Sequence, residues 1–179
     1  DGSGVLSFAE AGGGGWELVS HQTASTSASI SYTSMVTGYD YLLECVGFIP
    51  DTDNKIFEVE LGIAGPTYRT TGYLSFSNTL AGGTGIDTQG TTDVIASPGG
   101  QGSAADETGV YVIHLFNPAA ATDTHYKGTI GYHSSSTFSV GGNFNGHYPT
   151  AEAHTSIKAA YVSNNIASGE FFLYRRANT

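Results

Sequence analysis

Apolar and polar residues alternate in short runs along most of this chain, and runs of this kind predict β-strands. The clearest alternation lies in residues 56–63, because an extended strand points successive side chains to opposite faces. One face of this strand carries Phe57, Val59 and Leu61, and the other carries Glu58 and Glu60. Residues 39–49 instead form a nearly continuous apolar run, which suits a central strand covered on both faces.

The other apolar runs are separated by clusters of Gly, Asn, Asp, Ser and Thr, the residues that favour turns. Roughly eight to ten strands with long connections are typical of two packed sheets. We therefore predict an all-β fold, a jelly-roll-like two-sheet β-sandwich with long loops. The predicted strands beyond the two above include residues 16–20, 25–32, 110–116, 125–132, 138–144, 155–162 and 170–174.

Three segments carry more specific expectations. Gly169 can take a positive φ at no Cβ cost, so we expect a turn there that delivers the closing strand. Residues 150–160 contain Ala and Glu that favour one helical turn near Pro149. In residues 65–109 the alternation of apolar and polar positions is weak. This long tract is rich in Gly, Thr, Ser and Asp, and only the apolar segment Asp93–Ala96 stands out, which is typical of a functional or mobile loop.

The length of 179 residues suits a single hydrophobic core. Gly12–Gly15 have too much backbone freedom for a regular element, so we predict that residues 1–15 are a Gly-rich leader and hinge. Residues 16–179 then form one β-sandwich domain. The chain opens with Asp1–Gly4 rather than with a charged and apolar leader, which suggests the C-terminal part of a longer protein or a processed product.

Charge and cysteine usage narrow the classes of partner. Six Lys and Arg against 16 Asp and Glu give a formal net charge of −10, which argues against nucleic acid or an anionic membrane surface as a partner. Because no run approaches the roughly 20 apolar residues of a membrane span, we expect no membrane insertion. The lone cysteine, Cys45, cannot form an intrachain disulfide, and we expect it to be a small buried side chain.

Candidate catalytic and metal-binding groups are sparse. Glu58 and Glu60 share a strand face at a separation that can serve glycoside hydrolysis, but alternate charges on a strand normally form its solvent face. Asp51, Asp53 and Asn54 place three oxygen-bearing side chains in a turn, either as a calcium site or as an ordinary Asx turn. The histidines lack zinc-protease spacing, and neither a nucleophile elbow nor a Walker lysine is present. We therefore expect no enzyme activity and no cofactor, and we assign no metal ligand.

Surface recognition is the function class that these residues favour. Aromatic rings give rigid amphipathic area for stacking on sugars or for protein contact, and Asn, Ser and Asp add adaptable hydrogen-bonding groups. Four ring-bearing residues near predicted loops are the candidate ligand-binding residues, although each could instead pack at a strand end or a subunit interface. They are Tyr68, Tyr73, His147 and Tyr148.

Three blocks stand in order along the chain: Trp16–Ser20 followed by Gln22–Ser25, then Val112–Pro118, and finally Ile166–Tyr174. Together they resemble a module found at the C-terminal ends of bacteriophage tail fibres and related virion adhesion proteins, and the resemblance covers most of the chain. It implies a jelly-roll-like β-sandwich on the virion, often homotrimeric and exposed to the host surface. Residues 67–109 match no part of this pattern, and partner specificity is expected to vary there.

The resemblance implies a non-enzymatic tail-fibre or receptor-binding domain at the tail-fibre tip, assembled with other virion proteins, whose loops attach to a host cell-surface glycan or protein. A structural virion component on the capsid surface, such as a capsid decoration or head-fibre protein, is the alternative. A depolymerase that cleaves surface polysaccharide is a third hypothesis, and the missing acidic dyad disfavours it. The hinge at Gly12–Gly15 favours a tip attached to an upstream shaft.

Overall fold

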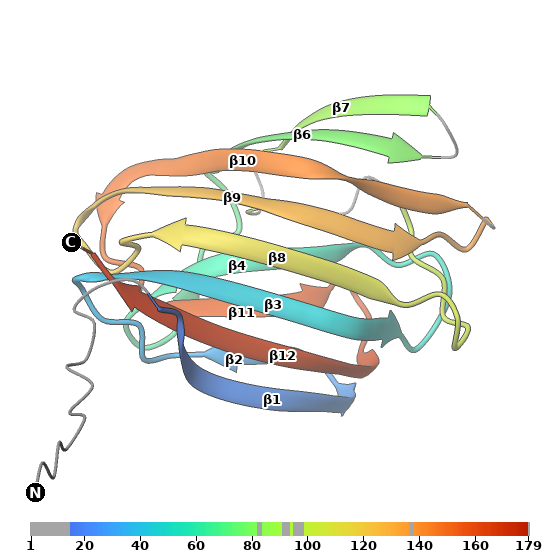
Figure 1. Cartoon of the computed structure of the whole chain (residues 1–179), viewed down its shortest axis with the longest axis horizontal. Coiled ribbons are helices and arrows are strands. Elements are labelled where there is room, and N and C mark those ends of the chain that lie inside the picture. Colours follow the sequence, from blue (N-terminus) through green and yellow to red (C-terminus); the bar gives the residue numbers. More distant parts are fainter. Residues whose placement is uncertain (1–14, 82–83, 91–93, 95–98, 137, 179) are drawn as a thin grey trace, which may run out of the picture.

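The computed structural model describes residues 15–81, 84–90, 94, 99–136 and 138–178. Within these residues the regular structure is entirely β-strand, as predicted from the alternation of apolar and polar positions. An 8-stranded and a 4-stranded antiparallel sheet lie face to face (Figure 1). The prediction of an all-β, two-sheet sandwich is therefore confirmed. In the described part of the chain there is no helix that could cross a membrane.

The strands follow the chain as β1 (Glu17–Ser27), β2 (Ile30–Tyr32), β3 (Tyr39–Pro50), β4 (Phe57–Ile63), β5 (Thr67–Tyr68), β6 (Leu74–Ala81), β7 (Thr84–Gly90), β8 (Gly109–Phe116), β9 (Thr122–His133), β10 (Ser139–Glu152), β11 (Ser156–Tyr161) and β12 (Ile166–Ala177). The large sheet has the order β1-β12-β3-β8-β9-β10-β6-β7, and the small sheet has the order β2-β11-β4-β5. In Figure 1 the large sheet lies in front of the small one. The last strand, β12, pairs with both β1 and β3, so the chain ends inside the large sheet.

The core lies between the two sheets and is rich in aromatic rings. Phe57, Val59 and Leu61 of β4 point into it with no exposed area, as their alternation predicts. Phe48 of β3 meets them from the large sheet, and its ring centroid lies 4.2 Å from that of Phe57. Cys45 is also fully buried, and burial raises the pKa of its thiol, so it is a core side chain as expected.

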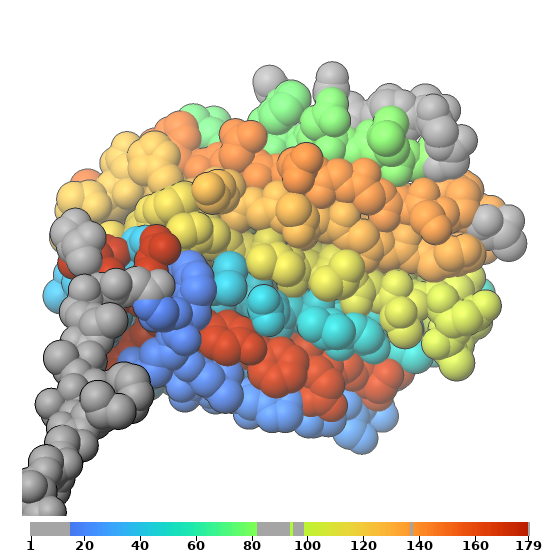
Figure 2. Space-filling model, in the orientation of Figure 1, coloured from blue at the N-terminus to red at the C-terminus, as the bar shows by residue number. Residues whose placement is uncertain are grey.

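The outward side of the large sheet, called the outer face below, carries no second layer of strands among the described residues. The prediction that residues 39–49 are covered on both sides is therefore wrong for this side of β3. Leu42 and Glu44 are only half-buried there, and Val46 is 45% exposed. The apolar run was continuous because Leu42 and Val46 are apolar residues on the open side. Figure 2 shows this face, with bands of colour that follow the sheet order β1, β12, β3, β8, β9, β10 and β6.

Gly169 has a positive φ of 148°, but it lies within β12 at a register shift rather than in the turn before it. The turn comes earlier, where Ser163 has a φ of 57°. A Cβ on Gly169 would stand 2.6 Å from the Cβ of Phe48, so the bulge lets β12 pass close to the buried ring. The predicted turn at Gly169 is thus a strand bulge.

Two segments predicted to be irregular contain strands. Residues 150–152 belong to β10, so the helical turn predicted near Pro149 is wrong, whereas β11 lies within the strand predicted at residues 155–162. Pro149 falls at the register shift of β10 with β9, where a missing N–H costs no regular ladder bond. In the tract 65–109, β6 and β7 pair as a hairpin on the edge of the large sheet.

Some predictions fall on residues outside the described part of the chain. Of the predicted leader and hinge, only Gly15 is described. Of the segment Asp93–Ala96, only Val94 is described; its side chain is fully buried and its N–H donates to the carbonyl of Val59 at 2.8 Å. Val94 therefore packs onto the core beside β4.

Candidate functional site

Strand register places the outward side chains of the large sheet in rows across its outer face. One row runs through Leu42 of β3, His114 of β8, Lys127 of β9, Asn145 of β10 and Phe76 of β6. Neighbouring strands lie about 4.8 Å apart, so successive members of a row are close enough to act on one ligand. These residues are far apart in the sequence, and the sheet brings them together.

A shallow groove of about 430 Å³ lies on this face over β8, β9 and β10. Its polar rim is made by Thr129, Asn143 and Asn145, which are exposed. In the described part of the chain their side chains make no hydrogen bond to other protein groups. Each therefore has a free donor or acceptor that points toward solvent over the groove. We call this site the outer-face groove, lined by Val112, His114, Lys127, Gly128, Thr129, Asn143, Phe144 and Asn145.

Lys127 carries the positive charge of the outer-face groove. Its ammonium lies 5.6 Å from the centroid of the Phe116 ring, a cation–π contact, and no ion pair is found for it within the described residues. Four other cations, by contrast, each face a carboxylate: Arg69 with Glu152, Lys158 with Glu60, Arg175 with Glu17, and Arg176 with Asp40. Lys127 is thus a cation without a counter-charge.

The strands around Lys127 contain few acidic residues. β6 and β8 contain no Asp or Glu, β9 contains only Asp123 and β10 only Glu152, and both of these lie close to a strand end. On β3 the acidic residues are Glu44, which faces Val112, and Asp40, which is paired with Arg176 and lies near His114. In a chain with a formal net charge of −10, the residues that line the outer-face groove thus include one cation and no carboxylate.

His114 and its neighbours close one side of the outer-face groove. The His114 Nε2 atom lies 3.5 Å from Asp40 Oδ2, and Arg176 donates to the same oxygen at 2.9 Å. The Trp16 ring packs edge-on against His114, with centroids 5.2 Å apart. Burial lowers the pKa of His114 and outweighs the opposing effect of Asp40. The imidazole is therefore neutral at pH 7, and Lys127 remains the fixed positive charge.

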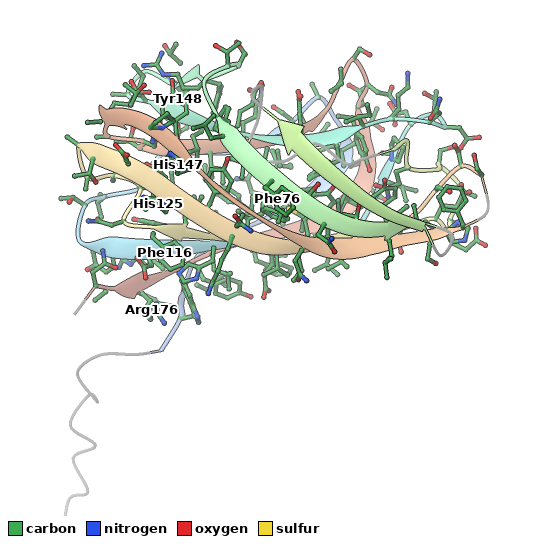
Figure 3. All side chains as sticks on the ribbon, turned by 90° about the horizontal axis from the view of Figure 1, so that it is seen from above. Phe76, Phe116, His125, His147, Tyr148 and Arg176 are labelled. Atoms are coloured by element: carbon green, nitrogen blue, oxygen red, sulfur yellow. The ribbon has the colours of Figure 1, made fainter. Side chains whose placement is uncertain are left out.

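Aromatic and imidazole rings border the outer-face groove at the strand ends. His125 of β9 and His147 of β10 are register partners whose rings stack at 5.2 Å. Phe116 of β8 is the partner of His125 on the other side. Figure 3 shows Phe116, His125 and His147 following one another across the sheet, with Phe76 farther along β6. The polar groups of the groove are therefore bordered by flat rings.

Two of the four predicted ligand-binding residues lie inside the core. Tyr73 and Tyr148 do come together, with ring centroids 5.1 Å apart, but Tyr73 is fully buried and Tyr148 is 7% exposed. The Tyr73 hydroxyl accepts from the Leu61 N–H at 2.7 Å and donates to the Arg69 carbonyl at 3.0 Å. Burial raises the pKa of Tyr73. These two rings pack as core residues, the alternative left open for each of them.

The other two predicted residues lie on different sheets. Tyr68, in β5, belongs to the small sheet, and the Lys158 ammonium lies 5.0 Å from its ring centroid. His147 belongs to the border of the outer-face groove. The structure does not gather the four candidates into one site, and a binding role for Tyr68 or His147 stays a prediction.

Sequence reasoning missed the polar residues of the outer-face groove. The signal was present, because Lys127 and Thr129 alternate with the apolar Tyr126 and Ile130, as Asn143 and Asn145 alternate with Phe144. The pattern shows that each pair faces outward from its own strand. It does not show that β9 and β10 pair with Thr129 opposite Asn143, which is what forms the site.

The turn at residues 51–54 has the contacts of an ordinary turn. Asp53 Oδ1 accepts from both the backbone N–H and the hydroxyl of Ser103, at 2.8 Å each, and these hydrogen bonds lower the pKa of Asp53. Asn54 has a φ of 62°, as Asn often adopts in turns. Among the described residues, no group of three or more His, Cys, Asp or Glu side chains could hold a metal ion.

The candidate carboxylate pair on β4 does not form a solvent face. Glu60 is only 5% exposed and pairs with Lys158, so the expectation of a solvated acidic face is wrong for this residue. Glu58 is half-buried. Glu60 is therefore enclosed beside Lys158, and the two glutamates do not form the open carboxylate pair that flanks a sugar in glycoside hydrolysis.

His154 forms a buried polar network away from the outer-face groove. Its ring has no exposed area, and Nδ1 lies 2.8 Å from the Thr124 hydroxyl while Nε2 lies 3.2 Å from Glu152. Glu152 also accepts two hydrogen bonds from Arg69. Burial lowers the pKa of His154, against the opposing effect of Glu152. The network joins β9 and β10 to the loop before β6.

This network predicts a loss of stability as the pH falls from 7.5 to 5. The unfolded chain takes up a proton at His154 near the ordinary pKa of about 6.5, before the folded protein does, so the free energy of unfolding declines by at most about 1.4 kcal/mol per pH unit for this group. Urea unfolding at several pH values measures the slope. The His154→Gln variant should show a shallower slope, although His114 contributes in the same direction. Equal slopes would contradict the assignment.

The chain was compared with known proteins at three levels. No family model, no curated protein sequence and no solved structure matches it.

Proposed function

We propose that this chain is a non-enzymatic recognition domain of a phage particle, a tail-fibre or receptor-binding domain that attaches to a host cell-surface glycan or protein. The observation that carries the proposal is the open outer face of the large sheet, with a groove of free polar side chains bordered by rings. Adaptable donors beside flat rings are the arrangement that recognises sugars and protein surfaces. The resemblance to virion adhesion modules supplies the biological setting.

A row of apolar residues across the outer face supports assembly with other chains. Val46, Val110 and Leu80 are 45%, 44% and 58% exposed, and strand register places them in one row. Gly131 and Gly141 stand between them in that row, so the surface there is low and apolar. Apolar rows of this kind favour contact with protein over contact with water. We include a homotrimer in the proposal on this ground and on the family resemblance.

We leave hydrolysis out of the proposal because Glu60, one of the two candidate carboxylates, is buried against Lys158. A reducing-sugar assay on bacterial surface polysaccharide tests this point. Release of sugar by the purified domain would replace the proposal with a depolymerase.

Cell binding tests the proposed function directly. We expect the fluorescent domain to label a subset of a bacterial panel and to block adsorption of the phage that carries it. Replacing Asn143 and Asn145 together with alanine should weaken cell binding by about tenfold, because two hydrogen bonds are lost. Ser31→Ala, on the small sheet at the partner position of Lys158, is the matched control and should bind normally. Absence of labelling and of competition would overturn the receptor-binding proposal.

The second candidate is a structural virion protein on the capsid surface, and the exposed apolar row at Val46, Val110 and Leu80 favours it. Electron microscopy of virions labelled at this domain separates the two candidates. Label at the tail tip supports attachment, whereas label over the capsid supports a decoration or head-fibre protein.

A further inference from the structure

We propose that the outer-face groove binds an acidic sugar, with the carboxylate of a uronic or sialic acid unit paired to Lys127. This inference rests on the proposed function and names the ligand class of the same site. The hydroxyl groups of the sugar would meet Thr129, Asn143 and Asn145, and one of its apolar faces would lie against the bordering rings.

The unpaired positive charge of Lys127 is the first reason to expect an acidic ligand. Lys127 is exposed, lines the outer-face groove and has no carboxylate partner in the described part of the chain. Its contact with the Phe116 ring holds the ammonium in place but leaves N–H groups free to donate. An ammonium that is positioned and unpaired suits a small anion, and a charge-assisted hydrogen bond is stronger than a neutral one.

The overall charge of the protein limits the ligand to few negative charges. With a formal net charge of −10, the chain repels nucleic acid, heparin-like chains and other dense polyanions at long range. At physiological ionic strength this repulsion is screened beyond about 8 Å, so a single carboxylate that reaches Lys127 experiences mainly the local cation. A mostly neutral polysaccharide with isolated acidic units fits both conditions.

The remaining contacts suit a sugar rather than a simple anion. Thr129 and Asn143 are partners across β9 and β10, and Asn145 is the partner of Lys127, so hydroxyl and amide groups surround the ammonium. The groove volume of about 430 Å³ lies within the range of about 300–1,000 Å³ for small-ligand sites. Phe76, the partner of Asn145 on β6, is 39% exposed and offers a ring for the apolar face of a sugar.

Matched sugars that differ in one carboxylate provide the test. Methyl glycosides of glucuronic and galacturonic acid, with methyl glucoside and methyl galactoside as neutral counterparts, are titrated into labelled protein and followed by amide NMR, and the methyl glycoside of N-acetylneuraminic acid represents sialic acids. We expect the acidic sugars to shift the amides of Lys127, Thr129, Asn143 and Asn145 at millimolar concentration. The neutral sugars should bind at least about tenfold more weakly, the value of one charge-assisted contact.

The variant Lys127→Gln keeps a polar side chain and should lose this preference. We expect its affinity for the acidic sugars to fall by about tenfold and its affinity for the neutral sugars by less than about twofold. Lys55→Gln is the matched control, because Lys55 also lacks an ion pair in the described residues but lies outside the groove. The inference is overturned if no acidic sugar shifts groove amides, if both variants behave alike, or if acetate or phosphate alone binds as well as the sugars. Groove shifts that depend only on protein concentration would also overturn it, since a second copy would then occupy this face.

Cell binding separates the failure of this inference from failure of the proposed function. If the domain labels bacteria and Lys127→Gln labels them equally, the recognition proposal stands and the acidic-sugar inference fails. If acidic sugars bind the outer-face groove but no cell is labelled, the inference stands and the receptor-binding proposal fails.

Discussion

Replacing Phe48 with alanine is expected to lower the free energy of unfolding by about 3–5 kcal/mol, the usual cost of removing a fully buried aromatic ring. The ring has no exposed area, and its centroid lies 4.2 Å from Phe57, 5.5 Å from Tyr111 and 6.1 Å from both Tyr161 and Phe171. These rings come from both sheets, so the loss weakens the contact between the sheets. Urea unfolding followed by far-ultraviolet circular dichroism measures the change.

Phe76→Ala is the matched control for this prediction. The same atoms are removed, but Phe76 is 39% exposed on the outer face, where little packing is lost. Its effect should stay near or below about 0.5 kcal/mol. Similar losses from the two substitutions would show that the Phe48 cluster does not join the sheets as described.

The backbone around Phe48 is a part of the fold that the apolar pattern of the sequence does not predict. Gly47, with a φ of 64°, lies at a register shift that re-aims Phe48 into the core after Cys45, so the strict period of two fails between these residues. Gly109 and Gly169 give the ring space, because a Cβ on either would overlap Phe48. The apolar residues at positions 39–49 indicate a buried strand, but they do not reveal a bulge at Gly47.

The parts of the fold that sequence does predict are those with clean periodicity. β4 and β8 lie where alternation or an apolar run places them, and Phe171 and Leu173 of β12 point into the core. The hairpin of β6 and β7 was missed because its inward residues are polar. Ser75, Ser77 and Thr79 are buried, with Ser75 donating to the Val94 carbonyl at 2.8 Å.

The candidate site was harder to predict than the fold, since a binding surface on a sheet depends on pairing between distant strands. Tyr73 and Tyr148 are aromatic residues near loops, yet a loop residue can still point inward, and both do. In the sequence, Lys127 is a single lysine in a run of alternating residues, a pattern that indicates no binding site. Its importance follows from the register of β8, β9 and β10, which surrounds it with neutral groups.

Adding a single methyl group at Gly128 is expected to destabilise the protein by about 1–3 kcal/mol, the usual cost of forced overpacking in a core. Gly128 lies on the inward side of β9, where a Cβ would overlap the carbonyl oxygen of Val112 and the ring of Phe144. Phe144 is itself 2% exposed and has little room to move, and the backbone of β8 is fixed by its pairs. Thermal and urea unfolding of Gly128→Ala measure the effect, and the same change should disturb the groove that this glycine lines.

Gly141→Ala is the control on the adjacent strand and the opposite face. A Cβ there would meet only the Ile130 carbonyl at 3.7 Å, an ordinary contact, and alanine costs less backbone entropy than glycine in a strand. This variant should therefore be neutral or more stable by up to about 1 kcal/mol. Because Gly128 and Gly141 lie on neighbouring strands, different outcomes would report the direction of each side chain rather than strand propensity. Equal tolerance of both substitutions would contradict the packing of Phe144 beneath the outer-face groove.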